Sequence, residues 1–109
     1  MHAIRMLHLE IYRIGKKLPK GDKLGIHAEV ERKCFKLLSC SIEAAYRPRK
    51  EKTETLVELR LTTEVLKNIW RTECELGIVD EKTYLRIAEK MVEISKMTNG
   101  WITYTQKGA

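Results

Sequence analysis

Apolar residues recur along the chain at intervals of three and four, which is the period of an amphipathic α-helix. No segment alternates apolar and polar residues as a half-buried β-strand does, so the pattern excludes a sheet. The first apolar stripe comprises Ile4, Leu7, Ile11, Ile14 and Leu18. The pattern therefore predicts an all-α protein.

Proline, glycine and capping residues divide this pattern into four predicted helices, at about residues 3–17, 23–46, 51–76 and 81–104. Pro19 and Pro48 end the first two, because proline disfavours helix in the residue before it. Gly77 supplies the stop of the third. Asp22 and Asp80 are the predicted N-caps of the second and fourth, since their carboxylates can accept hydrogen bonds from exposed amides.

The length of 109 residues corresponds to a single domain, residues 1–109. Helices of about 15 to 25 residues joined by short loops predict an antiparallel up-down-up-down four-helix bundle. Gly100 interrupts the last helix, where it either costs about 1 kcal/mol relative to alanine or marks a close helix approach.

The second predicted helix carries two apolar stripes that are displaced around it. One stripe comprises Leu24, Ala28, Phe35, Leu38, Ile42 and Ala45, and the other comprises Ile26, Val30, Leu37, Cys40 and Ala44. A helix that is apolar on more than one side has more surface to bury than one neighbour supplies. We therefore expect the chain to be oligomeric.

Several classes of protein are excluded by composition. No apolar run approaches the roughly 20 residues of a membrane span, and charges at Arg5, Glu10 and Arg13 interrupt any signal-peptide core. The three cysteines, which form no Cys-x-x-Cys pair, are Cys34, Cys40 and Cys74. We expect a soluble cytoplasmic protein with buried thiols, no disulfide framework and no zinc site.

The chain lacks a recognisable catalytic motif. Its glycines follow no predicted strand and form no nucleotide-binding loop. The histidines are His2, His8 and His27, and none has a serine or cysteine at the spacing of a nucleophile pair. His8 and His27 are expected at the flank of the core or within it. No Glu-x-x-His pair of a di-iron bundle occurs, so we predict no enzyme, no metal and no cofactor.

The net charge of +6 is unevenly distributed. Residues 1–53 hold 13 lysines and arginines against 6 acidic residues, whereas residues 54–109 hold 8 against 9. This asymmetry indicates a polyanionic partner. The alternative is ordinary solubility charge, which a value of +6 also fits.

Two basic clusters account for most of the excess. The first-loop cluster comprises Lys16, Lys17, Lys20 and Lys23, and the second-loop cluster comprises Arg47, Arg49, Lys50 and Lys52. In an antiparallel bundle they lie at opposite ends, about 36 Å apart at 1.5 Å per residue. A nucleic-acid backbone or two separate partners could contact both, and a small anion could not. We predict that both clusters bind nucleic acid, the arginines more strongly because a guanidinium binds phosphate oxygens in pairs. The alternative is that they are solvated helix ends.

Three short motifs carry a family resemblance: Leu18-Pro19-Lys20 after the first helix, Leu24-Gly25 at the second, and Gly100-Trp101-Ile102 late in the fourth. With this layout the chain resembles the accessory variability determinant (Avd-like) proteins of diversity-generating retroelements. These belong with the four-helix proteins encoded in intervening sequences of bacterial large-subunit ribosomal RNA genes.

The resemblance implies a non-enzymatic basic protein that assembles as a homopentamer. It also implies association with the element's reverse transcriptase and binding of DNA or RNA during mutagenic copying of a template repeat. The alternative within the same group is a protein-interaction module of the intervening-sequence type, with little affinity for nucleic acid.

Overall fold

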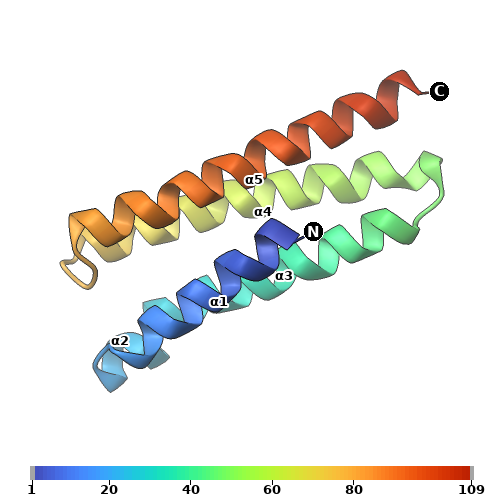
Figure 1. Cartoon of the computed structure of the whole chain (residues 1–109). Helices are drawn as coiled ribbons and strands as arrows, with labels where there is room; N and C mark the ends of the chain where they lie inside the picture. The colour runs from blue at the N-terminus through green and yellow to red at the C-terminus, as the bar shows by residue number, and fades with distance from the viewer. Residues whose placement is uncertain (1, 109) are drawn as a thin grey trace.

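The computed structural model describes residues 2–108, and over that range the chain is helical without strands. The long helices are α1 (His2–Lys16), α3 (Ile26–Tyr46), α4 (Arg49–Glu75) and α5 (Glu81–Lys107), and a short helix, α2 (Lys20–Leu24), precedes α3. Helix α3 packs against α4, α4 against α5, and α1 against both α3 and α5. Successive long helices run back and forth (Figure 1), which is consistent with an antiparallel bundle. The all-α prediction is confirmed.

Helix α1 is much shorter than its neighbours, with 15 residues against 21 in α3 and 27 in each of α4 and α5. Its N-terminus lies beside the middle of α3 (Figure 1), so α1 leaves one end of the bundle uncovered. We call this the open end; it comprises residues 46–52 and 101–108. The opposite, α2 end comprises residues 16–25 and 75–81, and holds α2 and the loop between α4 and α5.

The segment before α3 differs from the prediction. Asp22 lies inside α2, and neither α2 nor α3 has a side-chain N-cap. Pro19 is the N-cap of the short helix α2. Gly25 follows α2 with φ −92° and ψ −115°, which interrupts the helix before α3 begins. The Gly25 amide donates to the carbonyl of Gly21 at 3.0 Å, so backbone groups take the place of the cap predicted at Asp22.

Other boundary signals act as expected. Asp80 caps α5 by accepting a hydrogen bond from the amide of Thr83 at 2.7 Å. Gly77 takes a positive φ of 74°, which favours glycine because it has no Cβ to clash with the backbone. Gly100 marks no close helix approach, because a methyl group there would meet no neighbouring atom within 4 Å.

The two stripes of α3 have different surroundings. One is buried in the core, including Val30, Leu37 and Ala44. The other is largely uncovered, with Phe35 60% and Ile42 50% exposed. The described chain therefore buries one stripe and leaves much of the other available.

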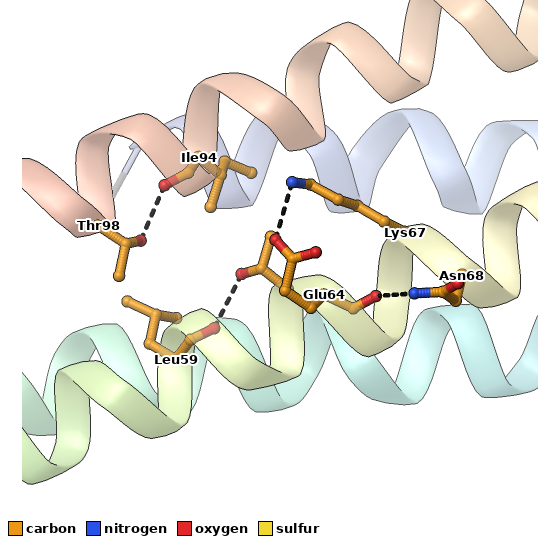
Figure 2. A network of polar contacts seen from close by, with 7 residues as sticks. Leu59, Glu64, Lys67, Asn68, Ile94 and Thr98 are labelled. Atoms are coloured by element: carbon orange, nitrogen blue, oxygen red, sulfur yellow. Dashed lines mark hydrogen bonds and ion pairs between the residues drawn. The ribbon is translucent and has the colours of Figure 1, made fainter.

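Two threonines within the core form hydrogen bonds to their own helices. Thr63 and Thr98 are fully buried, and their hydroxyls donate to the carbonyls of Leu59 and Ile94, each at 2.8 Å (Figure 2). These bonds satisfy the buried hydroxyls without a partner from another helix. These two hydroxyls are therefore not available to a ligand.

Candidate nucleic-acid interface

The second-loop cluster lies at the open end, where α3 passes into α4. Arg47 is the C-cap of α3, and Pro48 is the N-cap of α4 with an extended ψ of 153°. Arg49, Lys50 and Lys52 follow in the first turns of α4. Because proline fixes φ and cannot continue α3, the chain turns here and the four cations gather around the turn.

Carboxylates neutralise Arg47. Its guanidinium forms an ion pair with Glu43 and a second pair with Glu51, with 3.6 Å between nitrogen and oxygen. The hydrogen bond and the charge of Glu43 raise the pKa of Arg47. The sequence already indicates the pair with Glu43, since residues four apart on a helix are neighbours. Arg49, Lys50 and Lys52 form no ion pair with a described residue.

A surface pocket of about 290 Å³ lies at the same end between α4 and α5, and we call it the open-end pocket. It is lined by Arg49, Lys52, Trp101, Tyr104 and Thr105. Nε of Arg49 donates to the carbonyl of Thr105 at 3.4 Å, which joins the start of α4 to the end of α5. The pocket thus combines two cationic and two aromatic side chains, and the aromatic pair is not among the predicted site residues.

The first-loop cluster lies at the α2 end. Lys16 ends α1, Lys17 follows it, and Lys20 and Lys23 belong to α2; all four are exposed. The ammonium of Lys16 lies 5.4 Å from the centre of the Tyr12 ring, a cation–π contact. None of the four lysines forms an ion pair with a described residue.

Acidic residues share the α2 end with these lysines. Glu75, Asp80 and Glu81 lie in or beside the loop between α4 and α5. Hydrogen bonding by Thr83 lowers the pKa of Asp80, so its carboxylate stays charged. The positive field at this end is therefore diluted. The structure places the two clusters at opposite ends of the bundle, as expected from the sequence (Figure 1).

A buried polar contact joins three helices near the α2 end. His27 of α3 is fully buried, and its Nδ1 lies 2.8 Å from Oε1 of Glu73, which is also fully buried. Its Nε2 lies 2.8 Å from the carbonyl of Ile11 in α1. A carbonyl only accepts, so Nε2 carries a proton and donates it.

The second proton of His27 follows from its surroundings. Burial lowers the pKa of His27, but the hydrogen bonds to Glu73 and to the Ile11 carbonyl, together with the charge of Glu73, outweigh burial and raise it. The raised pKa favours the imidazolium form, in which Nδ1 donates to Glu73. The sequence predicts His27 at the flank of the core or within it. It does not predict the partner, because Glu73 lies 46 residues away and no local pattern connects the two.

No cluster of three or more potential metal ligands occurs within residues 2–108. The cysteines in this range are free, with Cys34 and Cys40 buried and Cys74 partly so. Burial raises the pKa of the Cys34 thiol to about 12, so it is protonated and poorly nucleophilic. No helix of the described chain is sufficiently long and apolar to cross a membrane.

The model of the bAvd-like family matches residues 2–105, which includes both basic clusters and nearly all of α5. The chain belongs to the bAvd-like family. This is the bacterial accessory variability determinant family, so the resemblance seen in the sequence is confirmed and the chain is an Avd-type accessory protein. No curated protein and no solved structure matches the chain.

Proposed function

We propose that this protein is a non-enzymatic accessory factor that binds nucleic acid and a reverse transcriptase during retroelement-driven mutagenic copying. Membership in the bAvd-like family supports the accessory role. The absence of any catalytic motif in the sequence fits a role in binding. Its partners are DNA or RNA, the reverse transcriptase and further copies of the same chain.

The observation that carries nucleic-acid binding is the set of exposed or half-exposed cations at both ends that form no ion pair with a described carboxylate. Arg49, Lys50 and Lys52 gather at one end, and the four lysines of the first-loop cluster gather at the other. Bidentate guanidinium groups and lysine ammonium groups both bind phosphate oxygens. Such contacts depend little on base sequence and strongly on salt.

Exposed apolar side chains support assembly into the homopentamer that the family resemblance implies. Phe35 and Ile42 are uncovered on α3, and Leu61 and Val65 are uncovered on α4. A ring of identical chains would repeat each basic cluster around its axis, so weak contacts to one nucleic acid would add through avidity. Light scattering at micromolar concentration tests assembly, and a particle of one chain's mass would contradict it.

Charge reversal at each end tests the binding proposal. Replacing Arg47, Arg49 and Lys50 by glutamate should weaken binding to all sequences and flatten the salt dependence. The plot of log affinity against log salt should become shallower by about 0.7 to 0.9 for each phosphate that is no longer neutralised. The matched variant, with Lys16, Lys17 and Lys20 reversed, should be affected less. Circular dichroism and light scattering check that both variants keep their helices and their assembly.

The same experiment separates the proposal from its alternative. If both triple variants bind DNA and RNA as the parent does, the clusters are solubility charge. A protein-interaction module of the intervening-sequence type would then fit better. Co-purification with the reverse transcriptase of a diversity-generating retroelement tests the second partner, and the polymerase should be retained by the parent chain in the presence of nuclease.

A further inference from the structure

The open-end pocket joins two kinds of side chain that bind different parts of a nucleotide. Arg49 and Lys52 come from the start of α4, and Trp101 and Tyr104 come from the end of α5. Tyr104 is 75% exposed, whereas Trp101 is partly buried against the core and is therefore held in place. Cations bind phosphate oxygens, and aromatic rings stack on the faces of bases.

We propose that the open-end pocket binds a nucleotide unit of single-stranded nucleic acid. The base stacks on Tyr104 and Trp101, and its phosphate contacts Arg49 and Lys52. This inference rests on the proposed nucleic-acid binding. It adds that the open end prefers single-stranded to double-stranded nucleic acid.

The preference for single-stranded over double-stranded nucleic acid follows from which faces of the bases are accessible. In a duplex both faces of each base are covered by its stacked neighbours, so an aromatic side chain can reach a base face only where the strand is open. Stacking also tolerates any sequence, because every base has a π-face. A pocket of cations alone would bind both forms of nucleic acid through the phosphates.

The arrangement of Arg49 favours this ligand over a purely structural role. Its Nε is directed to the carbonyl of Thr105, at the long distance of 3.4 Å. This bond uses one of the five N–H donors of the guanidinium, and no described carboxylate takes the others. The guanidinium is therefore positioned by α5 and still able to bind phosphate oxygens.

A second tyrosine at the same end supplies a matched control. Tyr46 is 87% exposed, and the surface groove that it lines contains Glu43 and Glu51. Those carboxylates repel phosphate, and they already occupy the one arginine in that groove, Arg47. Tyr46 is thus as accessible as Tyr104 without the two unpaired cations.

Tryptophan fluorescence tests the pocket in the unmodified protein. Trp70 is fully buried, with Nε1 donating to the carbonyl of Tyr84 at 3.1 Å, so contact quenching by a ligand reports on Trp101. A single-stranded 20-nucleotide oligomer should quench the emission, and the same sequence as a duplex should quench it much less at equal occupancy. Trp101→Phe should remove the quenching, which assigns the signal to Trp101, because Trp70 stays shielded in the core.

Affinity measurements with tyrosine variants complete the test. Tyr104→Ala should weaken binding of the single strand by about fivefold or more, the lower bound for loss of one base stack. It should change binding of the duplex by less than about twofold, and Tyr46→Ala should change neither. Thermal melting confirms that both variants fold, as expected for exposed side chains.

The outcomes distinguish this inference from the proposed function. If the parent binds both forms, but Tyr104→Ala behaves like Tyr46→Ala and neither form quenches Trp101, the stacking pocket is wrong and phosphate binding stands. If Tyr104→Ala weakens both forms equally, the preference for single strands is wrong. If the parent binds no nucleic acid at low salt, the proposed function and the pocket fail together.

Discussion

Near the α2 end, helices α1, α3 and α4 meet around His27, whose two ring nitrogens contact Glu73 and the Ile11 carbonyl without access to solvent. At the open end α1 is absent, and the polar groups of α4 and α5 face outward around Arg49 and Tyr104. Polar side chains thus serve two purposes in this bundle. Buried and paired, they fix the position of a helix; exposed, they remain available to a ligand.

This comparison predicts a division of effects. Substitutions at the buried contact should change the stability of the bundle, and conservative ones should leave binding per folded molecule intact. Substitutions at the open-end pocket should change binding at constant stability.

The largest effect on stability is expected from Glu73→Ala. It removes one partner of a fully buried ion pair and leaves the imidazolium without its carboxylate. Such a change costs about 3–5 kcal/mol. Glu75→Ala is the control, since Glu75 is exposed and pairs only with Arg71 among the described residues, and it should change stability by less than about 0.5 kcal/mol. Urea unfolding followed by circular dichroism measures both, and equal destabilisation would contradict the buried contact.

Two glycine substitutions should act in opposite directions. A Cβ added at Gly15 would lie 2.7 Å from Cδ2 of His27, and the ring cannot move away because both of its nitrogens are held. Gly15→Ala should therefore destabilise by about 1–3 kcal/mol. Gly100 faces open space within α5, so Gly100→Ala should stabilise by about 0.5–1 kcal/mol. Thermal melting separates the two, and a stabilising Gly15→Ala would show that the ring can shift.

The helices can be predicted from the sequence because their signals are local. The apolar period, Pro48, Gly77 and Asp80 each act within a few residues, and the structure has the corresponding boundaries. The predicted Asp22 cap is wrong because a local signal at one residue can be overridden by another nearby. Asp22 has the sequence position of an N-cap, but Gly25 interrupts the helix three residues later and separates α2 from α3.

The candidate site is only partly predictable. Basic residues that are close together in the sequence are easily found, but charge alone puts Arg47 on a par with Arg49, although Glu43 and Glu51 neutralise Arg47. The pairing of Tyr104 with Arg49 depends on how α5 packs on α4, more than 50 residues away in the chain. No local pattern contains that information, and the same is true of the His27 contact.

Stability should depend on pH through His27. Its pKa is raised in the folded state, so protonation stabilises the fold below its ordinary pKa of about 6.5, and this stabilisation is lost as pH rises through the raised value. Glu73 and Glu31 are the carboxylates that act on the ring. The free energy of unfolding should therefore fall as pH rises from about 6.5 through the raised pKa. The variant His27→Gln should lack this slope, and an unchanged slope would assign it to other groups.

The smallest effect contrasts two arginines at the open end. Arg47→Gln and Arg49→Gln each remove one positive charge, so equal changes are expected if only net charge matters. The local contacts predict a difference, because Arg47 is bound by Glu43 and Glu51 whereas Arg49 forms no ion pair with a described residue. Arg49→Gln should reduce the salt slope of nucleic-acid binding by about 0.7–0.9 for each phosphate that the guanidinium neutralises in the parent. Arg47→Gln should leave the slope nearly unchanged, because its guanidinium is already neutralised by carboxylates. Fluorescence anisotropy at several salt concentrations measures both slopes, and equal reductions would mean that the open end attracts nucleic acid through its overall charge and not through individually placed cations.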